Sequence, residues 1–402
     1  MLNVRERPDQ EESRRIINVD VPRHRSDLYD RKFITAFLNT IDNPTNQGLL
    51  TTHLFYDLPS SGPLASSSLP YDPINILSGG KAWERHIDDS IHNNTYSLLD
   101  NDEDVIKYAI QHSLVQTLPR TIKFVSYGGG NAFDRKEFRI VNAVVEDSNR
   151  DVSDFCAVDI LERFAIGGAV AANRLFGIRS QGVVGDILCN GKLAIDETTG
   201  SPVVMIFGGS FENTPSTSNA PDPRESTAIA WAKMNIQHGL GSTVIKTFDT
   251  DQDPARQEEA YSPSKNFEAF ILSAFARAIQ LGIIEDASYD VLENWRLKRE
   301  FDLQLSSVKL IAECKKTHTL KINGTNRKFL GGETPDRRTI TLSHKWGDLT
   351  HIDIAKRAGY EIKHIYSNDE NPVHLLVAEA TKRPDRDLLD MINQQSQPPL
   401  PH

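Results

Sequence analysis

Glycine and aspartate residues follow a series of apolar runs in the middle of the chain. The run at residues 122–127 ends in three consecutive glycines at 128–130, and the next apolar run ends at Asp159. A third run ends at Gly185 and Asp186. Ligands of open parallel sheets bind at the carboxyl ends of the strands, where glycine lets the backbone approach and a carboxylate can hold a ribose. The order of these residues therefore predicts a nucleotide-type site.

Taken one at a time, these residues have ordinary structural explanations. Three glycines after a strand can form only a tight turn, and Asp159 or Asp186 alone would suit the start of a helix. A dehydrogenase that binds a dinucleotide is a weaker alternative, because Phe133 stands where the last glycine of G-x-G-x-x-G belongs. The order of the glycines and carboxylates along the chain favours a cofactor site.

Alternating strand-like and helical patterns should position these residues. Apolar residues recur at helical spacing in six segments, at 100–118, 135–145, 161–175, 228–238, 266–282 and 348–358. Strand-like runs separate the first four of these segments, and a further strand is expected at 242–249. Beyond residue 282 the pattern changes to alternating strands, at 300–305, 308–314, 317–322, 338–342, 361–366 and 373–380. These patterns predict an α/β sheet domain together with a second part of α+β type.

Size and composition describe an ordinary globular protein. The chain has 402 residues, of which 39% are hydrophobic and 25% charged, so it can bury the cores of two or three domains. The net charge of −10 argues against broad nucleic-acid binding and leaves a local basic patch open. Three cysteines without a C-x-x-C pair support neither a zinc ribbon nor a disulfide framework, and no spacing typical of metal ligands is found. Because the sequence has no run of 18 apolar residues and no apolar segment near residue 1, we expect no membrane span and a cytoplasmic protein.

The order and spacing of the motifs over residues 69–380 resemble the S-adenosylmethionine-dependent amino-acid N-methyltransferases. The histidine-specific enzyme of ergothioneine synthesis typifies this family, and fungal dimethylallyltryptophan N-methyltransferases belong to it. The resemblance implies a Rossmann-like class I methyltransferase sheet (residues 97–252 and 346–380) with a second α+β domain that binds the substrate (residues 31–96 and 253–345). From their composition, residues 1–30, which are rich in charged residues, are expected to form a flexible arm, and residues 381–402 a disordered tail.

The resemblance also implies roles for the glycines and carboxylates. The glycine turn would cradle the methionine part of S-adenosyl-L-methionine, Asp159 would hold the ribose, and Gly185 with Asp186 would contact the adenine. The implied cofactor-binding residues are Gly128, Gly129, Gly130, Asp159, Gly185, Asp186 and Gly208. The family has an acidic residue two positions before its first glycine, and Ser126 stands at that place here.

Five residues correspond to positions that bind the methyl acceptor in the family. Asn213 and Tyr261 match an asparagine and a tyrosine that hold the amino acid, and both could orient its amine for catalysis. Tyr96 lies in a segment that resembles the family's pocket, while Thr341 and Ser343 match a glutamate and a serine that bind imidazole in the histidine enzyme. From the residues alone, Asn213 could instead cap a turn, and either tyrosine could be a buried aromatic residue.

The departures from the family predict its chemistry with a changed substrate. Threonine at position 341 replaces a carboxylate that accepts from a ring N–H, and Gln252 replaces a lysine. We therefore expect methyl transfer to an amine of an amino acid or a derivative, and not to histidine. The alternative is a catalytically silent relative with a regulatory or binding role. A small-molecule substrate without nucleic-acid or membrane partners is expected, and the oligomeric state is not predicted.

Overall fold

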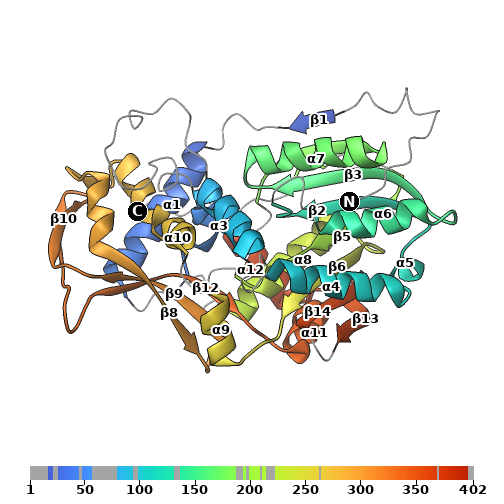
Figure 1. Ribbon diagram of the computed structural model, residues 1–402. Coiled ribbons are helices and arrows are strands. Elements are labelled where there is room, and N and C mark those ends of the chain that lie inside the picture. Colours follow the sequence, from blue (N-terminus) through green and yellow to red (C-terminus); the bar gives the residue numbers. More distant parts are fainter. Residues whose placement is uncertain are drawn as a thin grey trace.

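The computed structural model describes residues 17–20, 26–44, 48–56, 79–93, 98–130, 136–186, 193–195, 199–208, 211–213, 222–261, 264–368 and 371–396. An eight-stranded sheet occupies one half of the molecule, and helices with two smaller sheets form the other half (Figure 1). None of the helices in these ranges is long and apolar enough to cross a membrane. The expected cytoplasmic location stays a prediction.

The order of the strands in the large sheet reverses at its centre. The order is β1 (Ile17–Asp20), β4 (Arg179–Val184), β3 (Asp151–Asp159), β2 (Thr121–Tyr127), β5 (Ser201–Ile206), β6 (Thr243–Asp249), β14 (Asn371–Ala380) and β13 (Tyr360–Asn368). The strands from β1 to β6 are mutually parallel, and β14 runs antiparallel to both β6 and β13. Since the chain passes from β2 outward to β4 and then returns to β5, the topological switch point lies between β2 and β5. Ligands of open α/β sheets bind at this point.

Helices cover both faces of the sheet, which explains why the strands read as continuous apolar runs. On one face pack α4 (Leu98–Gln111), α5 (Leu114–Thr117), α6 (Glu137–Glu146) and α7 (Glu162–Phe176). On the other face pack α8 (Pro223–His238), α11 (Asp348–Arg357) and α12 (Arg386–Ser396). The single helix predicted over residues 100–118 is wrong, because Ser113 adopts a left-handed conformation with φ of +75° and divides α4 from α5.

The second half of the molecule has a core of its own. Three helices contribute to it, namely α1 (Ser26–Asp42), α3 (Gly79–Asn93) and α10 (Lys265–Gln280). One antiparallel sheet has the order β12 (Arg337–His344), β9 (Ser307–Cys314) and β8 (Trp295–Asp302), and the other has β11 (Thr325–Phe329), β10 (His318–Ile322) and β7 (Ile284–Glu285). Short helices complete this half, at η2 (Thr51–Leu54), α9 (Pro254–Ala260) and η3 (Tyr289–Asn294). The expected fold class, a Rossmann-like sheet with a second α+β part, is confirmed, while the predicted domain boundaries stay predictions.

The expectation of a disordered tail from residue 381 is wrong for residues 386–396. These residues form α12, in which Leu388 is fully buried and Met391 and Ile392 pack against the same core. The spacing of these three residues is helical. The expectation of a flexible arm over residues 1–30 is also wrong in part, because residues 17–20 form β1 at the edge of the sheet and α1 begins at Ser26. Residues 1–16 and 397–402 lie outside the described residues.

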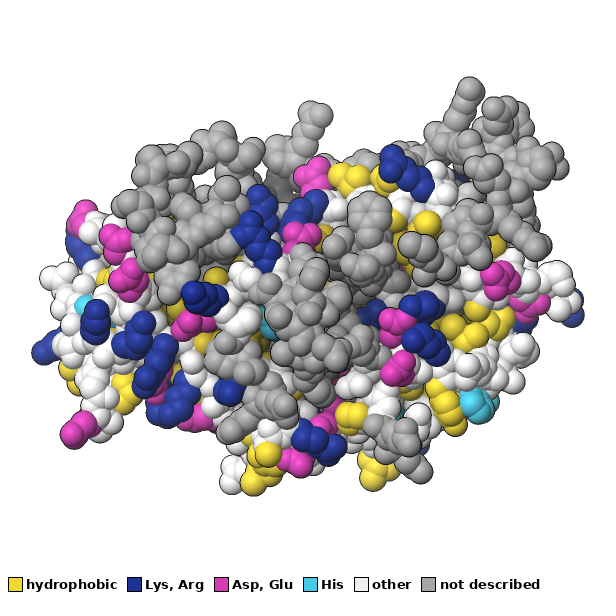
Figure 2. Space-filling model, viewed as in Figure 1, with side chains coloured by type: hydrophobic (Ala, Val, Ile, Leu, Met, Phe, Trp, Pro, Cys, Tyr) yellow, Lys and Arg dark blue, Asp and Glu magenta, His cyan; other side chains and the backbone are white. Residues whose placement is uncertain are grey.

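A local basic patch lies over β8 and β9, where dark blue side chains gather in Figure 2. Arg296, Lys298 and Arg337 all form ion pairs with Glu313, whose side chain is buried. Although burial raises the pKa of Glu313, the hydrogen bond and charge of Arg296 hold it below its usual value. The patch therefore contains its own carboxylate, and the ion pairs explain it as a structural feature.

Candidate active site

The glycine turn follows β2 directly, at the switch point of the sheet. Gly128 and Gly130 have φ of +64° and +66°, a left-handed conformation that favours glycine. The Gly128 N–H donates to the carbonyl oxygen of Val158 at 2.9 Å, which extends the pairing of β2 with β3 beyond the strand. A Cβ atom on Gly130 would meet no described atom within 4 Å. The turn is thus anchored to β3 at Gly128, and no described side chain fills the space beside Gly130.

The ends of β3 and β4 are joined by a hydrogen bond next to this turn. The Gly185 N–H donates to the carbonyl oxygen of Asp159 at 2.9 Å. The Asp159 carboxylate also accepts from the Leu161 N–H at 2.9 Å, so it holds the turn that leads into α7. Asp186 follows at once and is buried as well. Two carboxylates therefore stand at neighbouring strand ends, beside the glycine turn.

Gly208 lies on the other side of the switch point, after β5. Its φ is +74°, its N–H donates to the Thr247 hydroxyl at 3.1 Å, and a Cβ atom here would meet no described atom within 4 Å. The glycines at the two turns let a ligand approach the backbone closely, and the carboxylates at the ends of β3 and β4 are acceptors of the kind that the ribose hydroxyls of S-adenosylmethionine require. The described residues fit this cofactor.

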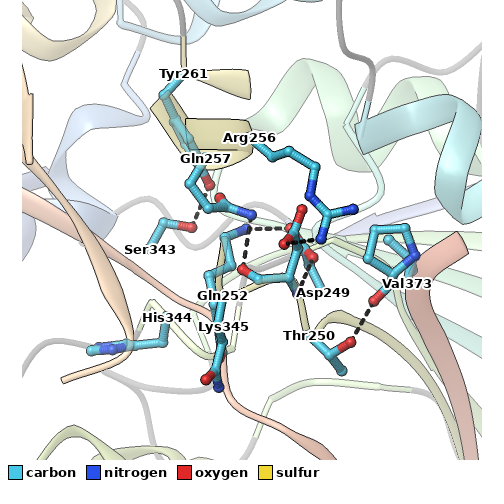
Figure 3. Close-up of polar contacts among 12 residues, drawn as sticks. Asp249, Thr250, Gln252, Arg256, Gln257, Tyr261, Ser343, His344, Lys345 and Val373 are labelled. Atoms are coloured by element: carbon cyan, nitrogen blue, oxygen red, sulfur yellow. Dashed lines mark hydrogen bonds and ion pairs between the residues drawn. The ribbon is translucent and has the colours of Figure 1, made fainter. Parts of the chain in front are cut away.

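Three of the five residues expected to bind the acceptor, Asn213, Tyr261 and Ser343, meet at the carboxyl end of β12. The Tyr261 hydroxyl, just after α9, lies 2.5 Å from the Ser343 hydroxyl (Figure 3). The next residue on the strand, His344, donates its backbone N–H to Oδ1 of Asn213 at 3.3 Å. Because Ser343 and His344 are adjacent, Asn213 from the sheet half and Tyr261 from the second half are brought to one place. Tyr96 lies outside the described residues.

Thr341 lies deeper on the same strand and is engaged by another hydroxyl. Its Oγ1 is 2.6 Å from Oγ1 of Thr51, and its exposed fraction is 5%. Thr51 belongs to η2, so the contact joins segments that are 290 positions apart. The pairing of β12 with β9 is irregular between Thr339 and Thr341, which turns the strand at this point.

A buried ion pair that was not singled out from the sequence lies next to these residues. Nζ of Lys345 donates to Oδ2 of Asp249 at 2.7 Å, and it lies 5.3 Å from the centre of the Tyr261 ring (Figure 3). Gln252 donates its side-chain amide to the Lys345 carbonyl oxygen at 2.9 Å. The pair links the end of β6 to the end of β12. Lys345 follows Ser343 by two positions, and this closeness to a predicted acceptor-binding residue is the sequence signal that could have identified it.

A second buried ion pair supports the turn that carries Asn213. Lys246 of β6 pairs with Glu212, and both side chains are almost completely buried. Nδ1 of His351 lies 3.9 Å from Oε1 of Glu212, but burial, assisted by the charge of Lys246, lowers the pKa of His351 well below its usual value. His351 is therefore neutral, and Lys246 is the cation that balances Glu212.

His344 is also neutral at ordinary pH. Burial lowers its pKa to about 4, and its Nδ1 lies 2.5 Å from the Ser307 hydroxyl. The ring stacks on Trp346 with the ring centres 4.5 Å apart. His344 thus contributes packing and its backbone N–H to the site. Among the described residues, no cluster of His, Cys, Asp or Glu could hold a metal ion.

Several solved methyltransferase structures are similar to the chain at low sequence identity. An S-adenosylmethionine-dependent methyltransferase from Clostridium acetobutylicum has 10% identity and a TM-score of 0.39, with 75% of this chain and 98% of that chain covered. An amino pentose methyltransferase from Micromonospora echinaspora has 12% identity and a TM-score of 0.32, with coverage of 79% and 100%. The 1,6-didemethyltoxoflavin-N1-methyltransferase of Burkholderia thailandensis has 8% identity and a TM-score of 0.36, with coverage of 79% and 93%.

No curated protein sequence matches the chain. The model of one protein family, described as histidine-specific methyltransferase, SAM-dependent, matches residues 46–380. This match spans well over half of the chain and includes the glycine turn, the strand-end carboxylates and the carboxyl end of β12. The chain therefore belongs to the family of histidine-specific, S-adenosylmethionine-dependent methyltransferases.

Proposed function

We propose that the methyl acceptor is the amine of an amino acid, or of an amino-acid derivative, other than histidine. The observation that carries this proposal is the pair of hydroxyls formed by Thr341 and Thr51. Thr341 stands where the resemblance places a carboxylate that accepts from the imidazole ring. A hydroxyl that is buried and already hydrogen-bonded to a second hydroxyl is a poor substitute for that carboxylate.

The energetic consequence of this replacement is large enough to change the preferred substrate. A hydrogen bond to a charged group contributes about 1.5–3 kcal/mol and one to a neutral group about 1 kcal/mol. A ring N–H that meets a hydroxyl instead of a carboxylate therefore loses about 1–2 kcal/mol, which corresponds to roughly a 5- to 30-fold loss of affinity. Histidine would suffer this loss at Thr341, whereas a side chain without a ring N–H at this depth would not. The neutral hydroxyls therefore favour an acceptor with a less polar side chain.

Asn213 and Tyr261 are the groups that we assign to the reacting amine. S-adenosylmethionine supplies a methyl group on a positively charged sulfur. An amine with a pKa near 10 has to lose its proton before it can attack, and the oxygens of Asn213 and Tyr261 can then hold the N–H bonds so that the lone pair is oriented. Alignment of two bound reactants can lower the barrier by roughly 7–11 kcal/mol. The contacts of both residues with adjacent positions of β12 support this assignment.

The test is methyl transfer from radiolabelled S-adenosylmethionine to a panel of L-histidine, the aromatic amino acids and small primary amines. We expect kcat/KM for at least one amino acid other than histidine to exceed the value for histidine by about tenfold or more. A preference for histidine would contradict the proposal. The absence of turnover on the whole panel, with cofactor binding intact, would favour the catalytically silent alternative.

Two matched variants test the role of Thr341 directly. Thr341→Glu restores a carboxylate, and Thr341→Gln has the same size without the charge. We expect the glutamate variant to gain activity on histidine by about tenfold over the glutamine variant. Equal activity of the two variants on histidine would remove Thr341 from the acceptor pocket.

A further inference from the structure

A buried carboxylate is hydrogen-bonded to the end of the strand that precedes the glycine turn. The Ser126 hydroxyl donates to Oε1 of Glu137 at 2.6 Å, and each residue is only 1% exposed. Ser126 precedes Gly128 by two residues, and Glu137 is the first residue of α6, the helix that follows the turn. The two residues therefore connect the strand before the turn to the helix after it.

The position of Glu137 suits a negative charge. The N-terminal end of a helix carries a partial positive charge, and α6 has ten residues, enough to form a developed helix. A carboxylate in an apolar core is otherwise costly, because it loses its hydration. The hydrogen bond from Ser126 further fixes the orientation of the carboxylate, since a hydroxyl that donates to an ionised group forms a short and strong bond.

We propose that Glu137 provides the negative charge that holds the amino-acid end of S-adenosylmethionine at the glycine turn, with Ser126 orienting its carboxylate. The amino-acid end of this cofactor carries an ammonium group, so a carboxylate fixed at the turn attracts that end of the molecule and leaves the adenosine end unaffected. The structure thus assigns to a residue of α6 a charge that is missing from the strand, where Ser126 stands. Glu137 is a positioning residue in this account, and the account is independent of the identity of the methyl acceptor.

The test compares two ligands that differ in the amino-acid part. S-adenosylhomocysteine carries the ammonium group, and 5′-methylthioadenosine lacks the whole amino-acid part. In titration calorimetry, Glu137→Gln should weaken binding of S-adenosylhomocysteine by about tenfold or more, that is by about 1.4 kcal/mol, and should change binding of 5′-methylthioadenosine by less than about threefold. Glu146→Gln, the same change at the exposed end of α6, is the matched control and should bind both ligands as the wild type does. Equal loss of both ligands in Glu137→Gln, or no loss of either, would overturn the proposal.

A second variant covers the case in which Glu137→Gln does not fold. The double variant Ser126→Glu and Glu137→Ser moves the carboxylate from the helix to the strand and keeps one hydroxyl and one carboxylate in the buried pair. We expect it to bind S-adenosylhomocysteine within about threefold of the wild type. A double variant that is folded, as judged by circular dichroism and thermal unfolding, but binds S-adenosylhomocysteine tenfold more weakly would refute the proposed role.

Discussion

Replacing Lys246 by methionine is expected to lower the free energy of unfolding by about 3–5 kcal/mol. The side chain of Lys246 is fully buried, and that of its partner Glu212 is 2% exposed. Oε2 of Glu212 has no hydrogen-bond partner among the described residues, and His351 nearby is neutral. Among the described residues no other cation pairs with Glu212, so the variant would leave a buried carboxylate without a balancing charge. Methionine has nearly the volume of lysine, so that the loss comes from the charge and not from a cavity.

A double-mutant cycle separates the part of this loss of stability that comes from charge from the part that comes from packing. Lys246→Met with Glu212→Gln removes both charges, and replacement of a whole buried pair is often close to neutral. The double variant should therefore regain most of the stability that Lys246→Met loses. Urea unfolding followed by circular dichroism gives the free energies of unfolding. An unchanged slope of this free energy against urea concentration would show that the variants expose the same surface on unfolding as the wild type.

An exposed lysine provides the control. Lys107 contacts Glu103 and Asp104 at 3.3 Å, but half of its side chain is exposed. Exposed pairs contribute about 0–1 kcal/mol, so Lys107→Met should change the free energy of unfolding by less than about 1 kcal/mol. If Lys246→Met were no more destabilising than Lys107→Met, the reasoning that Lys246 balances a buried charge would be refuted.

Three further predictions concern the site. Asp159→Asn should weaken binding of S-adenosylhomocysteine by about tenfold or more, because it removes a charged acceptor at the end of β3, and calorimetry measures this directly. Tyr261→Phe should lower kcat/KM for the acceptor by about tenfold or more while cofactor affinity stays unchanged, and a parallel loss of both would instead indicate a general disturbance. The free energy of unfolding should fall as the pH is lowered from 7 to 4, since His344 has a pKa of about 4 in the folded state against an ordinary value of 6.5, so that the unfolded state binds more protons in this range. The slope from one such histidine reaches at most about 1.4 kcal/mol per pH unit, and His344→Asn should reduce it.

The central strands and the cofactor turn could be predicted from the sequence because both are local. Strands buried on both faces read as continuous apolar runs, and the structure places β2, β3, β4, β5 and β6 where such runs occur. The glycines at 128 and 130 adopt the positive φ values for which glycine is needed. A pattern within about ten residues contains the information in each case.

The remaining features depend on contacts between distant residues. Thr51 and Thr341 meet across 290 positions, and Asn213 meets His344 across 131. Leu388 is buried because α12 packs against α8. This packing involves a distant segment, and the polar composition around Leu388 alone predicts disorder. The sequence around Ser113 also does not show that the helix is divided there. The left-handed conformation of Ser113 is rare for residues other than glycine, so a serine does not predict it.

Ser126 and Thr341 both stand where the resemblance places a carboxylate. The groups next to their hydroxyls differ, and this difference bears on function. The Ser126 hydroxyl donates to a carboxylate, that of Glu137. At Thr341 the hydroxyl lies 2.6 Å from another hydroxyl, that of Thr51, and 3.4 Å from the Leu342 carbonyl oxygen, so both of these partners are neutral. When a missing carboxylate is replaced by another carboxylate nearby, the site keeps its charge. When it is not replaced, the site recognises different ligands. This contrast supports a cofactor site whose charge is retained together with an acceptor pocket that has become neutral. It also gives an order of sensitivity that can be measured: Ser126→Ala should affect cofactor binding more than acceptor preference, and Thr51→Ala should do the reverse.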